Sequence, residues 1–174
     1  QYQFESVQNS TSLEVNSTFG SSFFNEFRFV YTRIRDNRDP SGDLFPAVNI
    51  QLEDGGVGLG VGGIEQANRL DQDLFEISNN LTYRRGDHMI EVGTQNEVFV
   101  FNNLFIPDLV GSYEFESFEV GDSTVTAIEA FERGQPTNYS HTYANPAVHG
   151  NNARPEPQFT GMQFGLYVQD KWDV

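Results

Sequence analysis

The sequence predicts an all-β fold, an antiparallel transmembrane β-barrel to which this chain contributes about five strands. Three observations predict it. Apolar and polar residues alternate through several runs, as they do in strands with one apolar and one polar face. Short and long connections alternate between these runs. Aromatic residues make up 14% of the chain although only 37% of it is hydrophobic, which suits strands that carry large apolar groups on one face.

The first two predicted strands, Ser12–Phe19 and Phe23–Arg35, form a hairpin. In the second strand Phe27 and Phe29 lie on one face, and polar residues alternate with them on the other. The turn between the strands, Gly20–Ser22, has about three residues and contains a glycine, which tolerates the backbone angles of a tight turn. This hairpin is expected to end on the periplasmic side.

The third predicted strand, Leu70–Arg84, has one apolar face and one polar face. The face expected to meet lipid carries Phe75, Ile77, Leu81 and Tyr83. The face expected to meet the barrel lumen carries Glu76, Ser78, Asn80 and Thr82. Because neighbouring residues of a strand point to opposite faces, this segment can present lipid-compatible and water-compatible surfaces at the same time.

The fourth predicted strand, His88–Asn102, follows the third after a short turn, Arg85–Asp87, in which Gly86 can adopt a positive φ. The fifth, Phe159–Val174, alternates Phe164, Leu166 and Val168 with small or polar residues. These two runs are both longer than the 9–11 residues that a transmembrane strand needs.

The connections on the other side are long, covering residues 36–69 and 104–158. A compact soluble domain seldom has loops of more than about 12–15 residues. Short turns alternating with long loops are typical of bacterial outer-membrane barrels, in which the short turns are periplasmic and the long loops face outward. The two long connections are therefore expected to form extracellular loops at the outer mouth.

The charge and the cysteine count exclude several classes of function. The formal net charge of −15 would repel a phosphate backbone, so we expect no nucleic-acid partner. The chain has no cysteine, which excludes disulfides and thiolate metal sites. An acidic surface is compatible with cationic ligands, or with simple solvation.

Candidate sites are few, and all lie in the long loops. Asp36, Asp39 and Asp43 could ligate Ca²⁺ through oxygen, but their spacing is not that of an EF-hand, and a plain acidic loop is the alternative. Gly58–Gly63 matches the G-x-G-x-x-G pattern without the preceding strand and following helix of a dinucleotide site, which predicts a flexible loop. We expect no cofactor.

Aromatic residues in the second long loop are the candidates for substrate binding. Tyr113, Phe115 and Phe118 could contact a ligand at the extracellular mouth, or they could pack the loop onto the barrel rim. His88, His141 and His149 are scattered and form no zinc-binding pattern. No nucleophile or carboxylate pair is marked out as catalytic, so we expect the protein not to be an enzyme.

Seven short segments resemble, in this order, the barrel of TonB-dependent receptors. The resemblance is to the Oar-like type, which bears a carboxypeptidase-regulatory domain and is typical of Bacteroidetes. It covers about residues 11–174 and is loosest in the two long loops, and its most specific element is Tyr167–Trp172. The segments are Asn25–Phe29, Tyr31–Asp36, Leu70–Glu76, Gly86–His88, Val92–Glu97, Asn103–Ile106 and Gly165–Trp172.

The resemblance implies a place in the bacterial outer membrane and energy-coupled import of an unidentified substrate. The family's barrel has 22 strands and a plugged lumen, so residues 1–174 are expected to be a fragment of such a barrel, with no plug domain and no TonB box visible. The implied partners are outer-membrane lipid, the remainder of the same barrel, and a TonB-type energy-coupling protein that engages a region absent from this sequence. A surface lipoprotein or another outer-membrane complex partner is also compatible.

Two other classes remain open from the residues alone. One is a secreted β-rich binding module, such as an adhesin or a carbohydrate binder, which would bury its apolar faces between two sheets. The other is a secreted hydrolase that uses paired loop carboxylates. The alternation and the rhythm of the connections favour the barrel over both.

Overall fold

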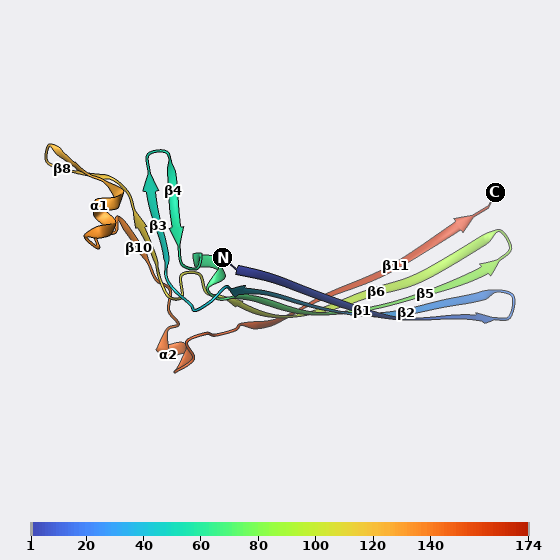
Figure 1. The fold of residues 1–174 in the computed structure, drawn as a ribbon. Helices are drawn as coiled ribbons and strands as arrows, with labels where there is room; N and C mark the ends of the chain where they lie inside the picture. The colour runs from blue at the N-terminus through green and yellow to red at the C-terminus, as the bar shows by residue number, and fades with distance from the viewer. Residues whose placement is uncertain (1, 174) are drawn as a thin grey trace. The chain divides into compact units, whose positions relative to one another are not determined.

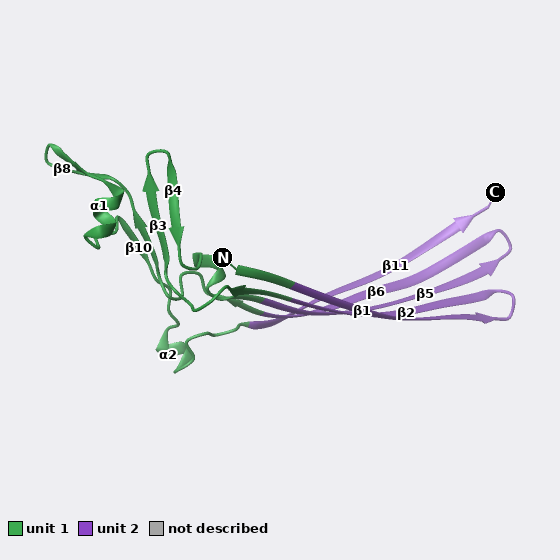
Figure 2. Ribbon diagram, in the orientation of Figure 1, with its two compact units in different colours: residues 1–5, 36–69, 103–157 green, residues 6–35, 70–102, 158–174 purple. Residues whose placement is uncertain are grey.

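The computed structural model describes residues 2–173, and strands make up most of it (Figure 1). The chain divides into two compact units, coloured separately in Figure 2. The wall unit comprises, among the described residues, 6–35, 70–102 and 158–173. The connection unit comprises residues 2–5, 36–69 and 103–157, and thus contains both long connections.

Five long strands run side by side in chain order, β1-β2-β5-β6-β11 (Figure 1). They are β1 (Tyr2–Phe19), β2 (Phe23–Pro40), β5 (Asn68–Arg85), β6 (His88–Phe105) and β11 (Gln158–Trp172). The expected all-β fold and the five strands are confirmed. The sheet is open, as expected for part of a larger barrel.

Several strands are longer than the alternation predicts. β1 begins at Tyr2 rather than Ser12, and β2 continues to Pro40 rather than ending at Arg35. The expectation that a loop begins at Asp36 was therefore wrong. Strand pairing depends on backbone hydrogen bonds, so it can continue where the side chains no longer alternate between apolar and polar.

The two short turns fall where the sequence predicts them. β1 and β2 are joined through Gly20, with a φ of 63°, and β5 and β6 are joined through Gly86, with a φ of 61°. Both values lie in the left-handed region, which favours glycine because it has no Cβ. The turns lie at the same end of the wall unit (Figure 1).

The two faces of β5 differ in exposure in the way a barrel wall requires. On the apolar face Phe75, Ile77 and Leu81 are 36–43% exposed. The polar face is half-buried; it carries Glu76, Ser78, Asn80 and Thr82. A soluble sheet would bury its apolar side chains, whereas a membrane barrel directs them outward.

Two stacked aromatic pairs join β2 to β5. Phe23 stacks on Tyr83 with ring centroids 4.5 Å apart, and Tyr31 stacks on Phe75 at 4.9 Å. Phe23 and Tyr31 are eight residues apart on β2, which is about 26 Å along the strand, or about 20 Å across a bilayer at a tilt of about 40°. The pairs fit the two aromatic girdles that flank the apolar band of outer-membrane barrels.

β6 and β11 are antiparallel along the whole length of β11, from Gln158 opposite Asn102 to Trp172 opposite His88. Tyr167 lies opposite Gly93, and its ring covers the position where a side chain at Gly93 would start. Its hydroxyl lies 2.6 Å from Glu91 Oε1 and 2.9 Å from Asn80 Oδ1. One tyrosine therefore spans β6 and reaches β5.

The connection unit has its own sheet, in which strands from both long connections pair. The strand order is β10-β7-β3-β4, and β3 and β7 are parallel. The strands are β3 (Ala47–Leu52), β4 (Gly55–Leu59), β7 (Ser112–Phe115) and β10 (Asn138–Ser140). The remaining elements are η1 (Gly63–Glu65), β8 (Phe118–Val120), β9 (Ser123–Val125), α1 (Ala127–Glu132) and α2 (Pro146–His149).

The flexible loop predicted for Gly58–Gly63 was wrong. Its first residues belong to β4, which pairs with β3 from Val48 opposite Leu59 to Leu52 opposite Gly55, and its last residue begins η1. Glycine weakens a strand, but pairing with β3 holds this one in place. Among residues 2–173 no helix is long and apolar enough to cross a membrane.

We predict that Gly93→Ala destabilises the wall. The added methyl group would overlap the Tyr167 ring, and overpacking of this kind costs about 1–3 kcal/mol. Urea unfolding of the full-length protein in detergent should show a lower midpoint. Gly161→Ala is the matched control, because its new Cβ would meet Phe99 at 3.9 Å, an ordinary contact. Equal midpoints for the two variants would contradict the prediction.

Candidate functional site

The sheet of the connection unit is the candidate functional site, and α1 covers one of its faces. The core between them contains Val48, Ile50, Phe115, Val125, Ala127 and Ala130. The helix begins with a capping box, because Thr126 Oγ1 accepts from the Glu129 N–H and the Glu129 carboxylate accepts from the Thr126 N–H at 2.9 Å. Small alanines on α1 let the helix approach the sheet closely.

The aromatic candidates of the second long loop pack inside this unit. Phe115 is 5% exposed and lies edge-on to Phe131, with centroids 5.2 Å apart. Tyr113 and Phe118 are partly buried against the same core. The ring of Phe115 therefore packs in the core of the connection unit, and Tyr113 and Phe118 contact the same core rather than a barrel rim.

A buried glutamine, which sequence reasoning missed, ties the two long connections together. Gln66 is 0% exposed. Its amide nitrogen donates to the carbonyl oxygens of Val61 and Gly111, at 3.2 and 3.0 Å, and its amide oxygen accepts from the Val110 N–H at 2.8 Å. Because one side chain satisfies backbone groups from both connections, it fixes the chain just before β7 next to the chain that follows β4.

The other face of the sheet is exposed and polar. Asn49 of β3 lies opposite Glu114 of β7 and Gly58 of β4, and Glu114 also accepts a hydrogen bond from Asn138 Nδ2 at 3.1 Å. A hollow of about 360 Å³ lies beside this row. It is lined by Asn49, Ile50, Gln51, Gly56, Val57, Gly58, Glu114, Phe115 and Glu116.

The connection unit carries most of the negative charge. Its ranges contain fifteen acidic and four basic residues, a formal charge of −11 out of the −15 of the whole chain. Each arginine is engaged within the unit. Arg69 bonds Glu156 at 2.6 Å, Arg133 lies 3.7 Å from Glu129, Arg154 donates to Gln66 O, and Arg38 lies over the Tyr2 and Phe4 rings. The acidic excess is thus not neutralised by the unit itself.

The aspartates proposed as metal ligands do not form a site. Asp36 and Asp39 lie in β2, and Asp43 lies in the bend that follows it. Throughout the described part of the chain, no three His, Asp or Glu side chains are placed so that they could hold a metal ion. His141 instead lies in a row of rings, 6.3 Å from Tyr139 and 6.0 Å from Tyr143.

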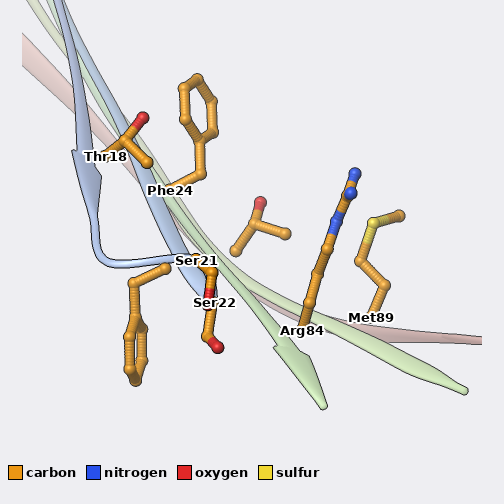
Figure 3. A pocket seen from close by; sticks show the side chains of 8 residues that line it. Thr18, Ser21, Ser22, Phe24, Arg84 and Met89 are labelled. Carbon is orange, nitrogen blue, oxygen red and sulfur yellow. The ribbon is translucent and has the colours of Figure 1, made fainter. Parts of the chain in front are cut away.

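The wall unit has hollows of its own. One, of about 340 Å³, lies near the turn between β1 and β2, and Thr18, Phe24, Arg84 and Met89 are among its lining residues (Figure 3). Another, of about 310 Å³, lies beside the turn between β5 and β6. A smaller one, of about 120 Å³, is lined by Arg28, Val30, Glu76, Ile77, Ser78 and Gln95. Most of the side chains that line this smallest hollow are polar, as expected for a surface that faces the barrel lumen.

A charged cluster joins β2 to β5 next to the Tyr31–Phe75 pair. Arg35 Nη2 bonds both carboxylate oxygens of Asp73, at 2.8 and 3.1 Å, and Tyr31 donates to the same carboxylate at 2.6 Å. Arg35 also donates to the Gln72 carbonyl at 2.8 Å. These groups are partly exposed, so the cluster sets the pairing of the strands more than it stabilises the fold.

Long strands in a meander, an outward apolar face and aromatic pairs at its two limits define a segment of an outer-membrane barrel wall. The chain belongs to the outer membrane beta barrel domain family, whose model matches residues 1–174. It is therefore a protein of the bacterial outer membrane. No curated protein and no solved structure matches it. The family displaces the alternatives of a secreted binding module and a secreted hydrolase.

We predict that Gln66→Leu loosens the connection unit without unfolding the wall. The leucine leaves the Val110 N–H and the Val61 carbonyl without this partner, whereas the Gly111 carbonyl keeps its bond from the Ala47 N–H at 3.0 Å. Each unsatisfied group costs about 1–3 kcal/mol. Hydrogen exchange measured by mass spectrometry should accelerate at least about tenfold around Val110, since 1.4 kcal/mol corresponds to tenfold. Gln135→Leu, at an exposed glutamine of the same unit, is the control and should leave the exchange unchanged.

We predict that the N-terminus of α1 frays in acid. The backbone N–H of Thr126, and then its hydroxyl, hold the pKa of the Glu129 carboxyl below its ordinary value of 4.5, and Arg133 acts in the same direction. Because the folded pKa is lowered, this stabilisation is complete above the unfolded pKa and is lost as pH falls through the folded pKa.

Backbone NMR shifts of Ala127–Glu132 in the micelle-bound protein should therefore move toward coil values in that acidic window. Glu129→Gln should show the frayed shifts already at neutral pH. Glu132→Gln removes the same charge from the same helix without touching the cap, and should behave like the unsubstituted protein. A transition that survives in Glu129→Gln would refute the assignment.

Proposed function

We propose that this chain is part of a TonB-dependent transporter that imports a bound substrate across the outer membrane. The observation that carries the proposal is the joining of the two long connections into one folded unit. Residues 36–69 and 103–157 share a sheet, a core and the Gln66 hydrogen bonds. A receptor that captures its substrate from outside needs structured outer loops of this kind.

In this proposal the two units have different tasks. The wall unit supplies part of the barrel, with the polar face of β5 toward the lumen. The connection unit belongs to the outer mouth and meets the substrate first. Its charge of −11 would raise the local concentration of cationic substrates and repel nucleic acid. No bond is made or broken, so the protein is a transporter rather than an enzyme and uses no cofactor.

The partners follow from the same proposal. The lipid-facing side chains contact outer-membrane lipid, and β1 and β11 pair with the remainder of the same barrel, because an open strand edge in lipid leaves backbone groups without partners. Energy comes from a TonB-type protein that engages another part of the transporter. A surface lipoprotein or another outer-membrane component completes the complex in which the transporter works.

The test is a comparison of three strains of the source bacterium, namely the wild type, a deletion of this gene, and a deletion of the TonB-type protein. Each is grown on the same defined mixture of peptides, oligosaccharides and metal chelates, and depletion of the medium is followed by mass spectrometry. We predict that a compound set taken up by the wild type is spared by both deletions, because uptake needs the barrel and the energy source together.

The control is wild-type cells whose proton gradient has been dissipated. These cells should leave the same set of compounds in the medium. Uptake that depends on this gene but not on the TonB-type protein or the gradient would make the barrel a passive pore and refute energy coupling.

A further inference from the structure

Strand β4 forms one edge of the sheet in the connection unit, and within residues 2–173 no strand pairs with its outer side. It runs Gly55-Gly56-Val57-Gly58-Leu59, and all five residues are exposed. Antiparallel strands direct the N–H and C=O of every second residue away from the partner. The outer side of β4 thus presents backbone donors and acceptors in strand geometry.

This edge lacks the usual protection against pairing. Protected edges carry lysine, proline, a bulge or very few residues. β4 contains neither charge nor proline, and its register with β3 is continuous from Leu59 to Gly55. The opposite edge, β10, has three residues and follows Pro136. The β10 edge of the sheet is thus protected against pairing with a further strand, whereas the β4 edge is not.

Gly56 and Gly58 have no side chains, so an open strip crosses β4 from this edge to the polar face of the sheet. We call this strip the lane. Gly58 lies opposite Asn49, which lies opposite Glu114, and Gly56 lies opposite Gln51. A strand added at the edge would be about 10 Å from β3, at about 4.8 Å per strand. With no side chain on Gly56 or Gly58, a long side chain of the added strand can lie across β4 toward the amides of Asn49 and Gln51, with Glu114 and Glu116 behind them.

We propose that β4 binds an extended, basic peptide segment, which adds to the sheet as a further antiparallel or parallel strand. Backbone hydrogen bonds to β4 provide the affinity, as in other cases of strand addition. Selection for lysine or arginine comes from Glu114 and Glu116, which line the same hollow of about 360 Å³ as Gly56 and Gly58. The −11 charge of the unit adds long-range attraction. This site goes beyond the proposed transport and does not depend on energy coupling.

The probe is a fluorescein-labelled peptide in which lysine alternates with valine or threonine, titrated by polarisation against the full-length protein in detergent micelles. A second peptide carries N-methyl groups on alternate amides, so that charge and side chains are kept but strand pairing is blocked. A third replaces lysine by glutamate. We expect the first peptide to bind at least about tenfold more tightly than either of the other two. For the N-methylated peptide, the loss of one to two backbone hydrogen bonds is enough for a tenfold difference.

Gly58→Lys is the test variant. Its Cβ would meet Asn49 Oδ1 at 3.6 Å, an ordinary contact, and Gly58 does not have a positive φ, so the strand can accept the side chain. The lysine fills the lane and should weaken binding of the first peptide at least tenfold. Val120→Lys, on the exposed part of β8, makes the same charge change elsewhere in the unit and should weaken binding less than twofold.

Hydrogen exchange decides the location. The β4 amides that point away from β3 should exchange rapidly in the free protein and become protected when the first peptide is added. Equal binding of the N-methylated peptide would reduce the interaction to charge attraction and overturn the proposal. Protection of these outward-pointing amides before any peptide is added would mean that another segment of the same protein, or a second copy, already occupies the edge, and would overturn it as well.

Discussion

The constraint on which the structure depends is that backbone N–H and C=O groups in hydrocarbon must be paired within the protein. Strands meet it only by pairing along their membrane-crossing length with a neighbour on each side. The long ladder between β6 and β11 pairs one side of each strand from Gln158 to Trp172. Once the ladders are set, alternate side chains are free to be apolar toward lipid and polar toward the lumen, which is the pattern seen on β5.

The wall could be predicted from the sequence because its signal is local. Apolar residues at every second position and a glycine in each tight turn are visible within one segment, and they placed all five strands and both turns. The ends of β1 and β2 were missed because the ladder continues where the side-chain pattern stops. There the pairing rests on backbone hydrogen bonds, which the order of side chains does not reveal. The residues around Asp36 therefore look like a loop in the sequence.

The connection unit was hidden for the opposite reason. Its defining contacts join segments far apart in the chain, as when β3 pairs in parallel with β7, and no local pattern announces such a pairing. Gln66 looks like an ordinary polar residue until its three backbone partners are known. One local signal could have been read, since Thr126 and Glu129 have the spacing of a capping box. The aromatic residues signalled a feature of interest, but Phe115 signals a core as readily as a binding surface.

Glycine has two opposite uses in the two units, and neighbouring side chains distinguish them. At Gly93 the missing side chain makes room for the Tyr167 ring, whose hydroxyl then reaches Glu91 and Asn80. That glycine is covered, and a larger residue there meets an obstacle. At Gly58 a side chain would meet only an ordinary contact, so packing does not explain why a strand with low intrinsic stability carries glycine. The proposed peptide site explains why glycine occupies position 58, because any side chain there would fill the lane beside Asn49.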